Sequence, residues 1–317
     1  MNYQNKYLKY KNKYLELKSI NNNSNTNMIG GDKNNFKIIT DKPKLKYLKY
    51  NGKNIIHTIN TIDNEILNEN SEFMIGSITK VFTGILIIIL NDKNILNIND
   101  NIDKYIKPNE NNKFENITIN NLLNHTGGII WYLTYNDIPN KYKIVNTSTE
   151  ALEIFMEKPL CVSEIGIKKY SSMGFIILGA IIEKVTGLSY IDALKKYILV
   201  PCKMTNTDIG EPNTTMYNNN ASIENSKIKE DKMEKYMVNA GGGLYSSIND
   251  MINFSKYIPK ILTPSQIKRC YGYYEKNIIS HGGFIYGGKA NFKVEYTNKW
   301  KIKSILIELE TWTNFDY

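Results

Sequence analysis

Hydrophobic residues gather most densely at residues 72–90, in the stretch EFMIGSITKVFTGILIIIL. Its apolar positions follow the spacing of one helix face, at Ile78, Val81, Phe82, Ile85 and Ile89. The run is longer than an ordinary strand, and most of its other positions are apolar too. Its longest uninterrupted apolar part, around 85–90, is too short to cross a bilayer. The pattern therefore predicts a core helix from about residue 77 to 90, and no membrane span.

Other segments predict further elements. KLKYLKYNGKNIIHTI, with Asn51-Gly52 as a two-residue turn, predicts a β-hairpin. YSSMGFIILGAIIEKVTG predicts a helix over about 172–185, which Gly187 caps at its C-terminus. SINDMINFSKYI predicts a third helix, and FKVEYTNKWKIKSILIELE predicts two strands. Because strands lie at both ends and helices between them, we expect one sheet built from both termini, with a helical insert.

This order predicts an α/β chain of the α+β type, in which helices flank an antiparallel sheet and a helical lobe adjoins it. We expect a basic arm and Asn-rich linker at 1–32 and one globular domain at 33–317. Within that domain, the predicted sheet lobe comprises about 33–100 and 237–317. The predicted helical lobe comprises about 101–236.

The N-terminal arm has a seam of about two heptads, formed by Tyr3, Tyr7, Tyr10, Tyr14 and Leu17. A helix of that length is marginal in water on its own. Two interpretations stay open: a frayed basic arm, or a docking or targeting helix through which the chain self-associates. The stretch KYLKYKNKYLELK resembles the start of many proteins of mimivirus-like giant DNA viruses.

The formal net charge of +9 raises the question of a nucleic-acid partner. Arg269 is the only arginine, although bidentate contacts to phosphate and guanine favour arginine. AT-rich codons explain the abundance of lysine, asparagine, isoleucine and tyrosine together, so we expect no nucleic-acid partner. The three cysteines and three histidines match no disulfide framework or zinc ligand set. Since no secretory signal is visible, we expect an intracellular (host cytoplasm) or virion protein.

Ser77 lies three residues before Lys80, at the predicted start of the core helix. Residues i and i+3 share a helix face, so the lysine is within reach of the serine hydroxyl. Serine needs a nearby base to act as a nucleophile, and lysine is a base only when burial or a positive neighbour lowers its pKa. Both conditions fit an apolar helix N-terminus, where the helix dipole is positive. The pair is therefore a candidate nucleophile and base.

Spacing alone does not single out Ser77, because Ser-x-x-Lys occurs twice more. Ser226 and Lys229 lie in the charged stretch ENSKIKED. Ser265 and Lys268 lie in LTPSQIKRC, whose proline is typical of a first helical position. Only Ser77 opens a helix predicted to be buried.

FMIGSITKVFTG resembles the nucleophile region of the serine β-lactamase-related family, which includes class C β-lactamases, penicillin-binding DD-peptidases and related esterases. The resemblance continues in order from about residue 36 to the C-terminus, in LNDKNILNINDNIDKYI, ITINNLLNHTGGI, YSSMGFIILGAIIEKVTG, PCKMTNT, AGGGLYSSINDMINF and SHGGFIYGG. It implies a β-lactamase/transpeptidase-like fold. It also implies a serine acyl hydrolase of an amide or ester, in a small molecule or peptide, that needs no metal or organic cofactor.

By this resemblance Ser77 is the acylated nucleophile, Lys80 its proton partner and Tyr170 the tyrosine that shuttles protons. We expect an ammonium beside Tyr170 to stabilise the phenolate, so that the tyrosine acts first as base and then as acid. His125, in the block ITINNLLNHTGGI, is expected to be structural.

His281 matches the basic residue of the family's third motif, on an edge strand expected to pair with an extended substrate. Gly282 and Gly283 fit a close approach of substrate to that strand. The backbone N–H groups of Ser77 and Phe284 are expected to form the oxyanion hole.

The second motif departs from the family pattern, because Ser172 stands where asparagine is usual. Serine offers a shorter arm and fewer fixed hydrogen-bonding groups. The span from Tyr170 to His281 is also short for the family. Both points favour a small ester or peptide substrate over a penicillin. The alternative is a non-catalytic scaffold or binding protein that keeps the β-lactamase fold, which Ser172 and the N-terminal arm favour.

Overall fold

The computed structural model describes residues 36–39, 47–58, 67–130, 145–157, 159–161, 163–210, 212, 239–274, 276–285 and 288–311. The predicted N-terminal arm and its linker lie outside these residues.

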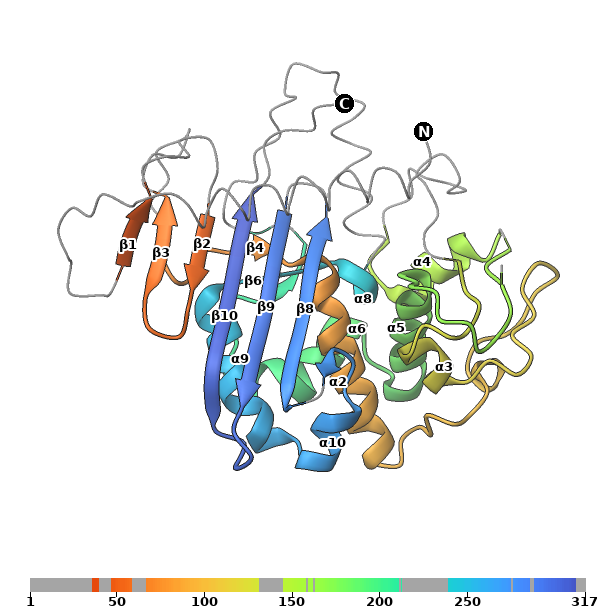
Figure 1. Cartoon of the computed structure of the whole chain (residues 1–317). Coiled ribbons are helices and arrows are strands. Elements are labelled where there is room, and N and C mark those ends of the chain that lie inside the picture. The colour runs from red at the N-terminus through yellow and green to blue at the C-terminus, as the bar shows by residue number, and fades with distance from the viewer. Residues whose placement is uncertain are drawn as a thin grey trace, which may run out of the picture.

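A seven-stranded sheet has the order β1-β3-β2-β10-β9-β8-β7 (Figure 1). Its strands are β1 Phe36–Ile39, β2 Tyr47–Tyr50, β3 Ile55–Thr58, β7 Tyr273–Tyr274, β8 Ile278–Ile285, β9 Gly288–Tyr296 and β10 Ile302–Thr311. Neighbouring strands are antiparallel, except that β1 runs parallel to β3. Since β2 pairs with β10, the first strands of the chain and the last ones form one sheet, as predicted.

The predicted hairpin between β2 and β3 is confirmed, but its turn is longer than two residues. Tyr50 pairs with Ile55, so the loop comprises residues 51–54. The Asn51 side chain accepts hydrogen bonds from the backbone N–H groups of Lys53 and Asn54, at 3.1 and 2.9 Å. The Asn51 side chain thus accepts hydrogen bonds from two backbone N–H groups of the four-residue loop.

The predicted core helix corresponds to α2 (Thr79–Asp92), which is seen to the right of β8 in Figure 1. All its residues from Thr79 to Leu90 are buried. Phe82 stacks on Phe254 of α9 (Ile248–Ile261), with ring centroids 4.2 Å apart. The α-helix begins two residues later than predicted, because Gly76–Ile78 form the 3₁₀ turn η1. Ser77 therefore lies in a tight turn that leads directly into the buried helix.

The helix predicted over about 172–185 is α5 (Met173–Thr186). The Ser171 hydroxyl accepts a hydrogen bond from the Gly174 N–H group at 2.9 Å, in the first turn of α5. Gly187, with φ of 66°, ends the helix in the left-handed conformation that glycine adopts without strain. The second motif thus enters α5 directly, as the sequence predicts.

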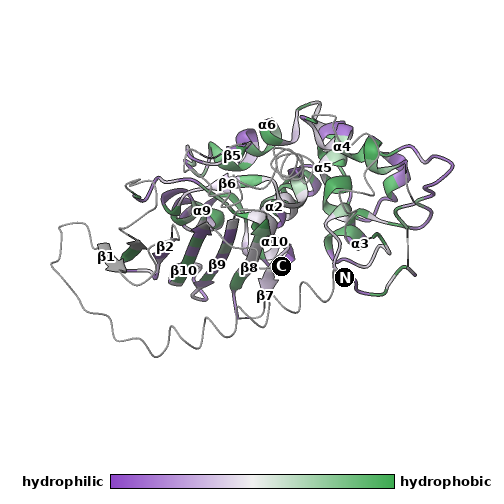
Figure 2. Cartoon of the chain, turned by 90° about the horizontal axis from the view of Figure 1, so that it is seen from above, coloured by the Kyte–Doolittle hydropathy of each residue, from purple (hydrophilic) through white to green (hydrophobic). Residues whose placement is uncertain are grey.

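Shorter elements complete the described part of the chain. The helical ones are η2 Ile102–Lys104, α3 Ile119–Leu123, α4 Ser148–Phe155, α6 Tyr190–Leu194, η4 Lys195–Leu199, α8 Asn239–Gly242 and α10 Pro264–Arg269. A second sheet has the order β4-β6-β5, with β4 Phe73–Met74, β5 Asp208–Ile209 and β6 Leu244–Ser246. Seen from above in Figure 2, α9 and α2 lie behind the large sheet, and α6 lies farther back. The fold thus places the N-terminus of α2 between the sheet edge and the helices around α5.

Candidate active site

Ser77 and Lys80 form a hydrogen-bonded pair at the start of α2. The Lys80 ammonium nitrogen lies 3.0 Å from the Ser77 hydroxyl oxygen, and it also donates to the Gly241 carbonyl in α8. The Lys80 side chain has no exposed surface. Burial penalises the charged form and lowers the pKa of Lys80 to about 7. Near neutral pH a large share of this lysine is therefore an uncharged base beside the serine.

The other Ser-x-x-Lys pair in the described residues lies in a different environment. Ser265 and Lys268 lie on α10 and are both exposed, and Pro264 occupies the first turn of that helix, as predicted. Ser226 and Lys229 lie outside the described residues. Burial of the lysine, and not the spacing, distinguishes the Ser77–Lys80 pair.

The segment that receives the lysine is part of the family resemblance, but the sequence predicts no site residue in it. Three side chains on α2 bind the backbone of residues 240–244: Thr83 donates to Ala240, Lys80 to Gly241, and Thr79 accepts from the Leu244 N–H group. An added Cβ on Gly241 would lie 2.9 Å from the Ser172 carbonyl oxygen. The glycine block AGGG is the available signal, since it permits this close docking of α8 against α2 and the second motif.

The Tyr170 hydroxyl is hydrogen-bonded to the side chains of Ser77 and Ser172. Its ring is partly exposed, whereas the hydroxyl is buried. Burial raises the pKa of Tyr170 to about 12, although these two hydrogen bonds act in the opposite direction. The expectation that an ammonium stabilises the phenolate is therefore wrong, because the lysine is the group that loses its proton first. At neutral pH Tyr170 is a proton donor.

His281 lies on β8, with its ring centroid 6.4 Å from that of Tyr170. Burial, followed by the nearby Lys80, lowers the pKa of His281 to about 4. The residue expected to be basic is therefore uncharged at neutral pH. The structure brings Ser77, Lys80, Tyr170 and His281 together, from three segments far apart in sequence.

The backbone of β8 passes against the turn that carries Ser77. An added Cβ on Gly76, whose φ is 50°, would lie 2.6 Å from the Phe284 nitrogen. A Cβ on Gly283 would lie 1.8 Å from the Ile75 carbonyl oxygen, whereas one on Gly282 would meet only Asn291 Oδ1, at 3.5 Å. Packing within the chain therefore requires Gly283, and the Phe284 backbone lies beside Ser77.

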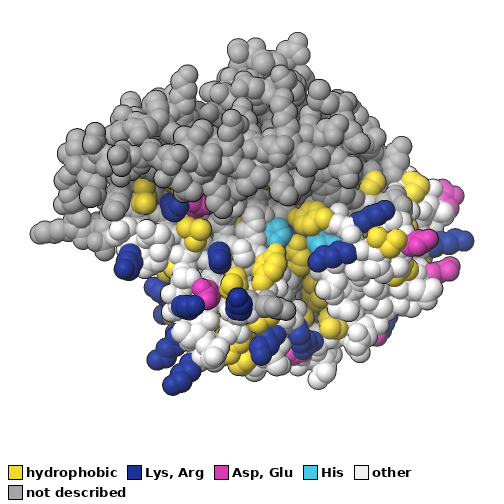
Figure 3. Space-filling model, viewed as in Figure 1, with side chains coloured by type: hydrophobic (Ala, Val, Ile, Leu, Met, Phe, Trp, Pro, Cys, Tyr) yellow, Lys and Arg dark blue, Asp and Glu magenta, His cyan; other side chains and the backbone are white. Residues whose placement is uncertain are grey.

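Several exposed apolar side chains lie on the face that carries this cluster. Tyr170 and Phe284 are exposed, as are Ile165 and Ile167 in the loop before the second motif. Figure 3 shows hydrophobic side chains gathered beside histidines on this face. These exposed apolar side chains, called the apolar rim below, favour an apolar group on a bound molecule.

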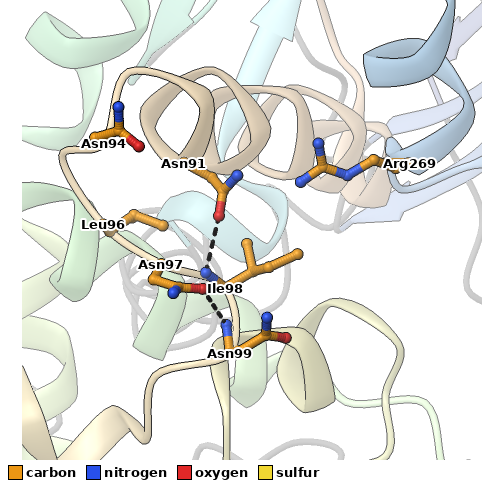
Figure 4. Close-up of a pocket in the computed structure, with 7 residues that line it drawn as sticks. All are labelled: Asn91, Asn94, Leu96, Asn97, Ile98, Asn99 and Arg269. Atoms are coloured by element: carbon orange, nitrogen blue, oxygen red, sulfur yellow. Dashed lines mark hydrogen bonds between the residues drawn. The ribbon is translucent and has the colours of Figure 1, made fainter.

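A pocket of about 280 Å³ lies at the far end of α2 (Figure 4). The Asn91 side chain accepts from the Ile98 N–H group at 3.0 Å, and that of Asn97 accepts from the Asn99 N–H group at 2.9 Å. Arg269 pairs with Asp92 at 3.1 Å. The polar groups around this pocket hold the loop after α2, and it contains no candidate nucleophile.

Within the described ranges, no group of three or more histidine, cysteine, aspartate or glutamate side chains is arranged to hold a metal ion. No single helix in that part of the chain is long and apolar enough to span a membrane.

Residues 47–271 match the family model described as Beta-lactamase. The chain belongs to the β-lactamase family. Over 149 residues it is 30% identical to Penicillin-binding protein 4* of Bacillus subtilis (strain 168), a match that covers 45% of this chain and 32% of the relative. Protein flp of Staphylococcus aureus (strain N315) is 36% identical over 149 residues, which is 45% of this chain and 29% of that protein. The match thus spans about a third of the length of these curated relatives.

Solved structures confirm the fold of this β-lactamase-family chain. A penicillin binding protein from Bacillus halodurans has a TM-score of 0.64 at 17% identity, covering 85% of this chain and 91% of that one. A D-amino acid amidase from Ochrobactrum anthropi SV3 has a TM-score of 0.64 at 16% identity, covering 86% and 87%. The predicted β-lactamase/transpeptidase-like fold is therefore correct.

Proposed function

We propose that this β-lactamase-family chain is a serine acyl hydrolase that works through an acyl-enzyme on Ser77. The observation that carries the proposal is the 3.0 Å contact between Ser77 Oγ and the fully buried Lys80, whose pKa falls to about 7. Serine becomes nucleophilic when such a base accepts its proton. The two Ser-x-x-Lys lysines in the described residues differ in this respect, since Lys268 is exposed.

Acylation begins with attack of Ser77 Oγ on the acyl carbon of the substrate, while uncharged Lys80 takes the hydroxyl proton. The carbonyl electrons move onto oxygen, which we expect the backbone N–H groups of Ser77 and Phe284 to stabilise. Each such donor lowers a barrier by about 3 kcal/mol in other serine hydrolases. The Tyr170 hydroxyl gives its proton to the leaving amine or alcohol as the carbon–leaving-group bond breaks. Lys80 then returns the serine proton to Tyr170.

Deacylation repeats these steps with water. Lys80 accepts a proton from the water that attacks the acyl carbon, and the ester bond to Ser77 Oγ breaks. The Tyr170 hydroxyl protonates the departing serine oxygen, and the proton held by Lys80 restores the tyrosine. The products are a carboxylic acid and the free enzyme.

The substrate that we propose is a small amide or ester with an apolar acyl group and no carboxylate near the scissile bond. The exposed apolar rim and the uncharged His281 support this choice. Similarity in fold to a D-amino acid amidase is consistent with it. A penicillin-type substrate fits less well, because Ser172 binds the Tyr170 hydroxyl and stands where asparagine is usual.

A substrate panel tests the proposal. Short-chain esters, D-amino-acid amides and a carboxylate-bearing chromogenic cephalosporin are offered to the wild type, to Ser77→Ala and to Ser265→Ala. We expect turnover of the uncharged substrates by the wild type and Ser265→Ala, and none above background by Ser77→Ala. Equal rates for all three proteins would instead indicate a non-catalytic scaffold with the β-lactamase fold.

A further inference from the structure

Tyr271 lies outside the family motifs, yet a chain of hydrogen bonds passes through it. The His125 Nδ1 atom accepts from the Ser171 backbone N–H group at 3.1 Å. His125 Nε2 lies 2.9 Å from the Tyr271 hydroxyl, which lies 2.9 Å from His281 Nε2. The Nδ1 atom of His281 lies 2.5 Å from the Gly282 carbonyl oxygen. The chain therefore connects the entrance of α5 with the strand β8.

Both ends of this chain set its direction. A backbone N–H group only donates, so His125 Nδ1 is an acceptor and the neutral ring carries its proton on Nε2. That proton points to the Tyr271 oxygen. A backbone carbonyl only accepts, so His281 carries its proton on Nδ1, and its Nε2 atom accepts from Tyr271. The contact at Ser171 and the contact at Gly282 therefore lead independently to the same result: the Tyr271 hydroxyl accepts from His125 and donates to His281.

His125 also binds the residues on both sides of Tyr170. Its carbonyl oxygen accepts from the Lys169 N–H group at 2.8 Å, and its ring nitrogen accepts from Ser171. Its ring lies 4.5 Å from the Tyr170 ring, measured between centroids. His125 has a φ of 59°, an uncommon conformation for a residue other than glycine. The surrounding contacts thus hold this histidine in a specific place.

Tyr271 is held as closely from the other side. An added Cβ on Gly84 in α2 would lie 2.5 Å from Tyr271 Cβ, so the tyrosine backbone packs directly on the nucleophile helix. The Phe175 ring in α5 lies 4.8 Å from the Tyr271 ring. Tyr271 therefore contacts α2, α5, His125 and β8 at once.

We propose that Tyr271 and His125 are positioning residues that reinforce the His281 tautomer favoured by the Gly282 carbonyl and hold Tyr170 and His281 in one geometry. The effect of Tyr271 and His125 on turnover rests on the proposed function, whereas the assignment of the histidine tautomers is independent of it. Burial lowers the pKa of His125 to about 3 and that of His281 to about 4, and it raises that of the Tyr271 hydroxyl. All three side chains are then uncharged at neutral pH, so each hydrogen bond in this network keeps its donor and acceptor. The structural role predicted for His125 is thereby extended to the positioning of His281 and Tyr170.

Nitrogen NMR of protein labelled with ¹⁵N-histidine tests the tautomers, and the three histidines make assignment by substitution practical. In the wild type at pH 7 we expect a proton on Nε2 of His125 and on Nδ1 of His281. In Tyr271→Phe only the Gly282 carbonyl still favours the Nδ1 tautomer of His281, so we expect a share of the Nε2 tautomer to appear beside it. We also expect a loss of about tenfold in the rate of Ser77 acylation by a fluorophosphonate. Tyr296→Phe is the matched control, since it removes another buried tyrosine hydroxyl, bonded to the Ser255 carbonyl at 2.7 Å.

A wild-type His281 protonated on Nε2 would overturn the proposal without any variant. The proposal would also be overturned if folded Tyr271→Phe had the same histidine tautomers and the same acylation rate as the wild type, even with a lower melting temperature. Tyr296→Phe is expected to change neither readout. A wild type that no probe acylates contradicts the proposed function alone, and the tautomers then decide the positioning role.

Discussion

Lys80 differs from an ordinary lysine in that its whole side chain is buried, with Ser77 Oγ and the Gly241 carbonyl as hydrogen-bond acceptors. Desolvation is the cause of its lowered pKa. The neighbouring Tyr170 hydroxyl is affected in the opposite chemical sense, because burial raises its pKa and keeps its proton in place. In the proposed mechanism Lys80 is therefore the base and Tyr170 the acid, because burial disfavours the charged form of each side chain.

Lys80→Met is expected to abolish acylation without lowering stability. The folded pKa of about 7 lies below the ordinary value of 10.5, so between these pH values the unfolded chain binds more protons than the folded one. Lys80 therefore destabilises the fold at pH 7, and this cost decreases as pH rises toward 10.5. We expect a Tm within about 2 °C of the wild type, or higher, by calorimetry at pH 7, because the lost bond to Gly241 offsets part of the gain.

The gain in stability of Lys80→Met over the wild type should also shrink as pH rises from 7 to 9. A fall in Tm of more than about 5 °C at pH 7, or a gain that grows with pH, would show that the lysine is charged in the folded protein. Lys268→Met, at the exposed Ser-x-x-Lys pair, is the control for removing one lysine charge.

At the scale of elements, the site depends on how closely strand β8 approaches the turn η1. The glycines at 76 and 283 leave no room for a side chain between the two backbones. Gly76 also needs its positive φ, which other residues adopt with strain. Gly283, which the sequence links to substrate approach, is thus required for joining two elements of the chain.

Gly283→Ala is expected to separate β8 from η1. The added methyl group meets the Ile75 carbonyl, a backbone atom that cannot rotate away. We expect a fall in Tm of several degrees and a loss of more than tenfold in Ser77 acylation, measured by melting and by intact mass against time. Gly282→Ala, one residue earlier and with space for its methyl group, should change Tm by less than about 2 °C. Equal melting temperatures for the two variants would contradict this packing.

The elements near the site are largely predictable, because local signals set them. Helical spacing and burial identify α2, and Gly187 marks the end of α5. Tyr271 is not predictable in this way, since its role depends on Gly84 and on two histidines far away in sequence. The direction of the Tyr170 pKa shift is not predictable from local sequence either. It follows from burial of the hydroxyl by the tertiary structure and not from the residues beside it in sequence.

For the whole molecule, the pairing of β2 with β10 is the connection that joins the two ends of the chain in one sheet. Leu48 in β2 has no exposed surface and belongs to the main hydrophobic core. The β2–β3 hairpin is therefore part of the folding unit. The proposed domain boundary near residue 33 places the predicted arm outside that unit.

Two truncations test this division. Removal of residues 1–32 is expected to leave Tm and the acylation of Ser77 unchanged. Removal of residues 1–58 takes away three strands of the large sheet and uncovers the edge of β10, so we expect aggregation or loss of cooperative melting. Inactivation by the shorter truncation would instead show that the arm belongs to the catalytic unit.

The rate at which a fluorophosphonate acylates the wild type, measured from pH 5 to 9 by intact mass with peptide mapping of the adduct, tests the Ser77–Lys80 pair most directly. We predict one adduct on Ser77, and a rate that rises about tenfold per pH unit below pH 7 and levels off above it, since only uncharged Lys80 accepts the proton. Burial lowers the pKa values of His125 and His281 to about 3 and 4, so these two side chains do not produce this rise. A rate independent of pH, or an adduct on another residue, would contradict the assignment of Lys80 as the base for Ser77.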